Sequence, residues 1–143
     1  MNIKTDESKI DKIKTKKIYL NDFELSNAAT LVEWGINPIQ VQICDSCGIV
    51  ACSDGGYIDI YKQNDLFILT IPSIYEYDNF ELSRRYPLEA IIQNGPIIIE
   101  QSQYRIIESC YSMNYTIGRY PEVKIKKFDF KFHHWSALRK TIY

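Results

Sequence analysis

The 143-residue chain predicts a single α+β domain, with an antiparallel β-meander over about residues 39–71 packed against several short helices. Three observations favour this fold. Short β-rich runs follow one another at intervals of about nine residues in the middle of the chain. Apolar residues recur at helical spacing before and after these runs. No linker-like segment or internal repeat divides the sequence, so residues 1–143 are expected to form one domain.

The first third of the chain predicts one strand and one helix. Apolar residues at the end of the lysine-rich segment favour a strand near 16–20, and the residues before it show no clear period. Asn21 followed by Glu24 is typical of a capping box, and Gly35 supplies a stop, which together predict a helix over about 22–34. The apolar residues of that segment have helical spacing: Leu25, Ala28, Ala29 and Val32.

The middle of the chain predicts four strands of the meander. Turn residues such as Ser53-Asp54-Gly55-Gly56 separate them, as expected between antiparallel neighbours. In the first run, apolar residues alternate with Gln40 and Gln42, which predicts one buried face and one solvent-facing side. The predicted strands are 39–43, 48–52, 57–61 and 66–71.

The remaining segments alternate between helical and strand-like patterns. Asp78 with Glu81 favours the start of a short helix, and a second helix is expected between Pro87 and Gly95. A compact apolar run at 96–99 fits a strand. Next, Ser102 is the expected cap of a helix whose apolar side includes Cys110, predicted to lie in the core. Alternating apolar residues over 123–132 are typical of a strand with a bulge, and two separate elements would also explain them.

Composition excludes several classes of protein. Hydrophobic residues make up 45% of the chain and aromatic residues 13%, which excludes intrinsic disorder. No apolar run approaches the roughly 20 residues needed to cross a bilayer, so no membrane association is expected. The amino terminus lacks the apolar core of a signal peptide, so the expected location is cytoplasmic.

Charge is distributed unevenly along the sequence. Residues 1–35 are neutral overall, whereas residues 36–110 carry four basic and ten acidic side chains, a balance of −6. Residues 111–143 carry seven basic and two acidic side chains, a balance of +5. The acidic middle segment is a candidate surface for a basic partner. Lysines interleaved with aromatic residues over 124–135 resemble a nucleic-acid platform, but alternating aromatics on a strand favour a core face, so nucleic acid is not an expected partner.

Three of the four cysteines lie close together, at Cys44, Cys47 and Cys52. Two cysteines separated by two residues and followed by Gly48 form the usual half of a zinc ribbon, because the tight turn aims both thiolates at one ion. Cys52 would be the third ligand. The identity of a fourth ligand is open, and the candidates are Cys110, His133 and His134.

Other interpretations of the cluster stay open at the level of sequence. A retroviral-type zinc knuckle would need a fourth ligand at the position of Tyr57, and tyrosine binds zinc poorly. A thioredoxin-like redox pair would need a helix directly after the first cysteine, where a strand is expected instead. The simplest alternative assigns Cys44 and Cys47 to a hairpin turn and treats Cys52 as a small buried hydrophobe.

The segment from Cys44 to Pro72 resembles an uncharacterised group of small bacterial proteins. The shared pattern is Cys-x2-Cys-Gly-x4-Cys followed by a Gly-Tyr pair and two short strands that end at proline. The resemblance implies a small cytosolic accessory protein and implies no catalytic residue. The matching residues are Cys44, Cys47, Gly48, Cys52, Gly56, Tyr57 and Pro72.

The sequence therefore predicts a binding or interaction protein that needs no cofactor, rather than an enzyme. One concrete form of this prediction is an immunity protein, in which residues 36–110 neutralise a basic toxin. The main alternative is a zinc-binding protein that uses Cys44, Cys47 and Cys52. A further alternative, an enzyme, would require a cleft lined with titratable groups, for example around His133 or His134.

Overall fold

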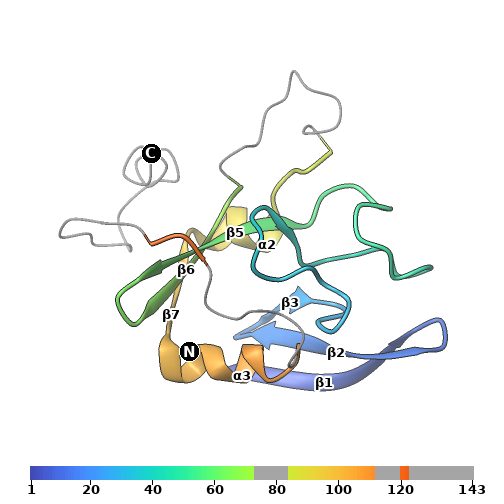
Figure 1. The fold of residues 1–143 in the computed structure, drawn as a ribbon, viewed down its shortest axis with the longest axis horizontal. Helices are drawn as coiled ribbons and strands as arrows, with labels where there is room; N and C mark the ends of the chain where they lie inside the picture. Colours follow the sequence, from blue (N-terminus) through green and yellow to red (C-terminus); the bar gives the residue numbers. More distant parts are fainter. Residues whose placement is uncertain (73–83, 112–119, 123–143) are drawn as a thin grey trace.

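The computed structural model describes residues 1–72, 84–111 and 120–122, and these fold into two antiparallel sheets and two helices (Figure 1). The element bounds are β1 Ile3–Ile10, β2 Ile13–Leu20, β3 Phe23–Ser26, β4 Ile39–Gln40, β5 Tyr57–Gln63, β6 Leu66–Thr70, α2 Glu89–Asn94, β7 Ile97–Glu100 and α3 Gln101–Glu108. An α+β architecture with antiparallel strands is thereby confirmed, although two helices are fewer than the prediction of several.

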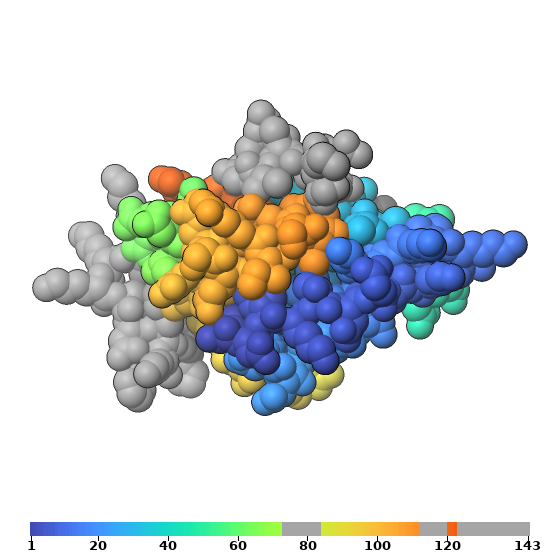
Figure 2. Space-filling model, turned by 90° about the horizontal axis from the view of Figure 1, so that it is seen from below, coloured from blue at the N-terminus to red at the C-terminus, as the bar shows by residue number. Residues whose placement is uncertain are grey.

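The first sheet is a long hairpin with a short third strand, in the order β1-β2-β3. Its register runs from the pair Ile3 and Leu20 to the pair Ile10 and Ile13 at the tip. The predicted strand at 16–20 is thus the second half of β2, and β1 occupies a segment to which the sequence pattern assigned no element. In Figure 2 the hairpin tip extends beyond the body of the protein.

The second sheet has the order β4-β5-β6-β7, and each strand is antiparallel to its neighbour. Both β5 and β6 lie where the sequence pattern predicted strands, and the apolar run near 96–99 is confirmed as β7. Most of β5 and β6 is buried on both faces, which explains the nearly continuous apolar sequence of β6, whereas β5 buries the polar Asp59 as well.

The core lies between the two sheets and is closed by α3. Helix α3 contacts β1 as well as β6 and β7, and Figure 2 shows α3 and β1 side by side. From α3, Tyr104 stacks on Phe67 of β6 with ring centroids 4.0 Å apart. Its hydroxyl lies 3.0 Å from the hydroxyl of Tyr111 and donates to that of Tyr120 at 3.1 Å. Cys110 is 3% exposed, which confirms its predicted place in the core.

The helix predicted over 22–34 is wrong. Residues Phe23–Ser26 form β3, and the following segment is a series of turns. The backbone amide of Ala29 donates to the carbonyl of Lys16 in β2, a partner far away in sequence rather than four residues back. The four apolar residues whose helical spacing suggested the helix are nevertheless fully buried: Leu25, Ala28, Ala29 and Val32. Their spacing therefore identified core residues but not the secondary structure.

The first two predicted strands of the meander also need correction. Only Ile39–Gln40 pairs as a strand, and residues 48–52 form a loop in which Ile49 is 62% exposed. Gln40, expected to face solvent, is 2% exposed. In place of a strand, the chain forms a loop that brings three cysteines to one point.

The later helices agree in place with their predictions. Helix α2 lies between Pro87 and Gly95, and α3 covers the segment expected to be helical. Ser102, however, is inside α3, whose N-cap is Glu100 without a side-chain cap bond. The predicted helix at 78–81, the predicted strand at 123–132 and the candidates His133 and His134 lie outside the described residues. Among the described residues no helix has the length and apolar character to cross a membrane.

Candidate metal centre

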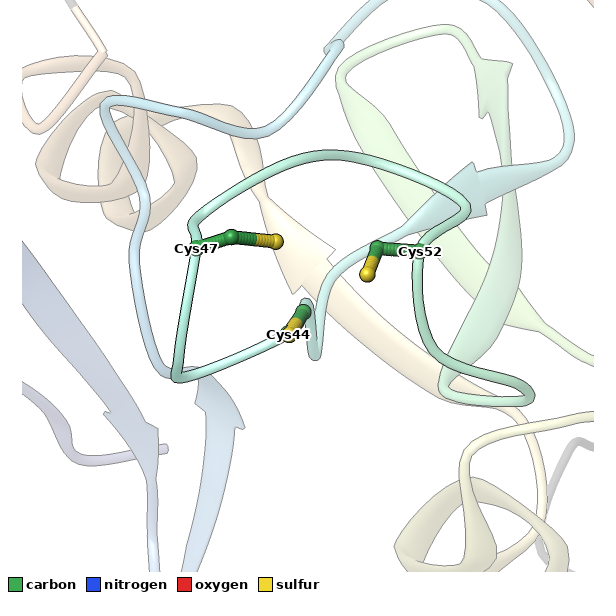
Figure 3. Close-up of side chains that lie close together, drawn as sticks. All are labelled: Cys44, Cys47 and Cys52. Carbon is green, nitrogen blue, oxygen red and sulfur yellow. The ribbon is translucent and has the colours of Figure 1, made fainter.

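The cysteine loop, residues 41–56, connects β4 to β5 and brings three thiols together (Figure 3). The Sγ atoms of Cys44, Cys47 and Cys52 all lie within 4.8 Å of one another. In Figure 3 the three side chains point into the space that the loop encloses. Cys44 and Cys47 are partly buried and Cys52 is exposed, so the cluster opens to solvent on one side.

A tight turn positions the first two cysteines. The amide of Gly48 donates to the carbonyl of Cys44 at 2.9 Å, and Gly48 has a φ of +69°. Glycine adopts this left-handed backbone readily, which explains the residue that follows the Cys-x-x-Cys pair. The turn also packs tightly, because a Cβ at Gly48 would lie 3.0 Å from a methyl carbon of Leu31 and 3.4 Å from one of Ile10. The hairpin tip of the first sheet thus supports the turn.

Backbone amides inside the turn point at the sulfur of Cys44. The N–H group of Cys47, followed by that of Ser46, stabilises the thiolate and lowers the pKa of Cys44 to about 7. Amides that donate to a thiolate are also the ordinary support of sulfur ligands in cysteine-bound metal sites. Cys44 is therefore prepared to act as an anionic ligand near neutral pH.

Gln40 fixes the part of the loop that carries Cys52. Its buried side-chain amide donates to the carbonyls of Ser53 and Gly55, both at 2.9 Å. Its carbonyl oxygen accepts from the amide of Ala51 at 2.7 Å. These three bonds satisfy backbone groups on both sides of Cys52 that would otherwise have no strand partner.

Asn27 fixes the other end of the loop. Its side chain donates to the carbonyl of Ile43 at 2.8 Å and accepts from the amide of the same residue at 3.0 Å. Ile43 directly precedes Cys44, so the two hydrogen bonds of Asn27 fix the backbone next to the first cysteine. Sequence patterns did not single out Gln40 or Asn27 as site residues, because polar residues of this kind carry no signal of the partner they meet in the fold.

The three sulfurs influence one another. Hydrogen bonds with Cys47 and then Cys44, together with the charges of these two neighbours, raise the pKa of Cys52 to about 11. Thiolates crowded at this distance repel each other, so the cluster resists losing all three protons. A bound cation would reverse this effect, because each thiolate would then be neutralised by the metal.

The donor set fits zinc. A tetrahedral zinc site with Zn–S bonds of about 2.3 Å places its sulfurs about 3.8 Å apart. The sulfurs of Cys44, Cys47 and Cys52 lie within 4.8 Å of one another, so each pair needs to approach by about an ångström or less. Thiolates are soft ligands that favour zinc over magnesium or calcium.

The structure places the remaining candidate residues as follows. Cys110 is buried in the core, where its thiol lies 3.5 Å from the carbonyl of Ile106, and it is not part of the thiol cluster. The alternative in which Cys52 is a buried hydrophobe is wrong, because Cys52 is exposed. Among the described residues no fourth ligand joins the three cysteines.

Comparison with protein-family models, with curated proteins and with solved structures found no match to this chain. The geometry of the cysteine loop is therefore the basis for the functional proposal that follows.

Proposed function

We propose that the protein binds one zinc ion through Cys44, Cys47 and Cys52. The observation that carries the proposal is the approach of three thiol sulfurs to within 4.8 Å of one another from only nine consecutive residues, Cys44 to Cys52. Two of the ligands come from one turn and the third from the opposite side of the loop. A ligand arrangement of this kind is a zinc-ribbon half completed by a third cysteine.

The role of the metal is structural. The cysteine loop has no strand or helix of its own, and its backbone is held chiefly by the side chains of Gln40 and Asn27. It packs at Gly48 against Ile10 of the first sheet and leads directly into β5 of the second. A zinc ion that ties the loop together would therefore stabilise the region where the two sheets meet.

Because Cys52 is exposed, we expect the fourth coordination position of the zinc to be open to solvent. Structural zinc sites have four protein ligands, whereas sites with three protein ligands leave room for water or for an added group. Cobalt substitution distinguishes three thiolate ligands from four, because thiolate-to-cobalt absorption grows with the number of cobalt–sulfur bonds. We expect absorption that corresponds to three thiolates in a tetrahedral site.

Elemental analysis of the purified protein tests the proposal. Protein prepared under reducing conditions, without a metal affinity column, is expected to contain close to one zinc per chain. Cys44→Ser and Cys47→Ser are expected to lose the metal, whereas Cys110→Ala, which removes a thiol outside the cluster, is expected to keep it. Circular dichroism of each variant reports whether the chain still folds.

Two results would contradict the proposal. One is a folded, metal-free protein whose stability does not change when zinc is added. The other is an equal loss of zinc in Cys110→Ala and in the cluster variants, because binding would then follow the total number of thiols and not the cluster.

A further inference from the structure

A small pocket lies beside the cysteine loop and contains no cysteine. Its volume is about 230 Å³. Two of its lining residues flank Cys52 in sequence, and the others come from β5 and from the segment that precedes α2. The lining residues are Ala51, Ser53, Tyr57, Arg84 and Arg85.

Backbone hydrogen bonds hold the two arginines at this place. The amide of Gly55 donates to the carbonyl of Arg84 at 2.7 Å, and the amide of Tyr57 donates to the carbonyl of Tyr86 at 3.2 Å. The close approach depends on Gly55, where a Cβ would lie 2.2 Å from the ring of Tyr86. The segment 84–86 is therefore fixed alongside the start of β5.

The pocket carries one positive charge that is not neutralised within the described part of the chain. Arg84 forms an ion pair with Asp54, and its guanidinium also reaches the carbonyl of Ala51 at 3.5 Å. Arg85 takes part in no ion pair among the described residues. Within the part of the chain that the structure describes, the lining residues include no carboxylate.

Tyr57 adds a neutral donor to the two guanidinium groups. Its side chain is 5% exposed, and burial raises its pKa even though Arg85 and Arg84 lie near enough to lower it. The hydroxyl therefore keeps its proton at neutral pH and donates. Guanidinium groups present several N–H donors in a planar arrangement that matches the oxygens of phosphate.

We propose that this pocket binds a small tetrahedral oxyanion, phosphate or a phosphate group, through Arg85, Arg84 and Tyr57. Arg85 supplies the charge that no ion pair among the described residues compensates, Arg84 adds a second guanidinium to the lining while paired with Asp54, and Tyr57 donates from the buried wall. The site is distinct from the thiol cluster, since its ligand is an anion and its donors are hard N–H and O–H groups.

Calorimetric titration of the full chain with inorganic phosphate at low ionic strength tests the proposal. Saturable binding of one phosphate per chain is expected. Arg85→Gln is expected to weaken binding at least tenfold, and Tyr57→Phe severalfold. Arg105→Gln is the matched control, because Arg105 lies on α3 and does not line this pocket, and it is expected to leave the affinity unchanged.

Absence of saturable binding would overturn the proposal, as would an equal loss in Arg85→Gln and Arg105→Gln, which would show a general charge effect. If Arg85→Gln fails to fold, Arg85→Lys replaces it, and weakened binding is still expected because lysine lacks the planar donor arrangement. Titration with phenyl phosphate separates two sources of the anion. Tighter binding than that of phosphate indicates a phosphate group on a larger ligand, and binding of inorganic phosphate alone indicates the free ion.

Discussion

At the scale of single residues, the side chains of Gln40 and Asn27 replace the strand pairing that the cysteine loop lacks. Together they make five hydrogen bonds to backbone groups next to Cys44 and Cys52. A buried backbone group without a partner costs about 1–3 kcal/mol, so the loop depends on these two amides. The sequence spacing singled out Cys44, Cys47 and Cys52 as candidate metal ligands. The alternation of apolar and polar residues, in contrast, predicted a solvent-facing side chain for Gln40. Periodicity does not reveal hydrogen bonds to residues that are distant in sequence.

Gln40→Ala is expected to lower the free energy of unfolding by about 1–3 kcal/mol, because it leaves the amide of Ala51 and two carbonyls without partners. Zinc affinity is expected to fall as well. Urea denaturation and a competitive zinc titration measure the two effects. Gln42→Ala is the control, since the side chain of Gln42 bonds to Glu24 and not to backbone groups beside Cys52. A similar loss of zinc affinity in both variants would contradict the assigned role of Gln40.

Gly48→Ala separates backbone strain from packing. Alanine in the left-handed region costs about 1–2 kcal/mol, and at Gly48 the new Cβ would also press on Leu31 at 3.0 Å. Gly35 has a φ of +93° with open space around it, so Gly35→Ala bears only the backbone cost. We expect Gly48→Ala to be the more destabilising of the two in chemical denaturation. Equal effects would show that packing against Leu31 does not constrain the turn.

Alkylation of the metal-free protein should depend on pH in a residue-specific way. The pKa of Cys44 falls from 9.0 to about 7, so its thiolate forms near neutral pH, and this group favours the folded state increasingly as the pH rises from 7 to 9. The pKa of Cys52 rises to about 11, so between pH 9 and 11 it favours the unfolded state.

Mass spectrometry after a short exposure to iodoacetamide measures these titrations. The expected midpoint is near pH 7 for Cys44 and near pH 11 for Cys52. Similar midpoints near 9 for both residues would show that the sulfurs do not interact in the metal-free protein.

At the scale of elements, the sequence patterns succeeded where strands are buried on both faces and failed where the chain is irregular. Short β-rich runs between turn residues located β5 and β6 to within about two residues, and the continuous apolar run of β6 reflects its burial on both faces. The segment 22–34 has buried residues at helical spacing, yet its backbone bonds reach β2 instead of closing helical turns. Tertiary contacts determined the backbone conformation of that segment, and such contacts cannot be derived from a single sequence.

Hydrogen bonds between buried tyrosine hydroxyls connect α3 to the segment at 120–122, and their contribution to stability can be tested by mutation. The hydroxyl of Tyr104 bonds with those of Tyr111 and Tyr120, and its ring stacks on Phe67. Tyr104→Phe keeps the stack and removes both bonds, so a loss of about 1–2 kcal/mol is expected in chemical denaturation. Tyr86→Phe is the control because Tyr86 is 43% exposed. No difference between the variants would mean that the buried hydroxyls contribute nothing.

At the scale of the whole molecule, the fold decides which charged residues of a sequence segment lie on the surface. Asp59, one of the ten acidic residues of the middle segment, is fully buried and accepts a hydrogen bond from Tyr61. The acidic character of that segment is therefore weaker at the surface than its sequence indicates. A basic toxin as partner stays a prediction, and an interaction measurement with a candidate toxin would test it.

The two proposed sites lie on neighbouring parts of one loop. Cys52 contributes to the thiol cluster, whereas Ala51 and Ser53 on either side of it line the pocket of Arg84 and Arg85. The cysteine loop would thus join the proposed zinc site to the proposed anion site, close to where it packs on the first sheet at Gly48. Both proposed sites depend on an ordered conformation of the cysteine loop.

X-ray absorption at the zinc edge of the purified protein tests the central claim most directly. We expect three sulfur ligands at about 2.3 Å and one lighter ligand, together with the loss of the signal in Cys44→Ser. A zinc shell made only of nitrogen and oxygen, or with a single sulfur, would contradict the claim that Cys44, Cys47 and Cys52 hold the metal.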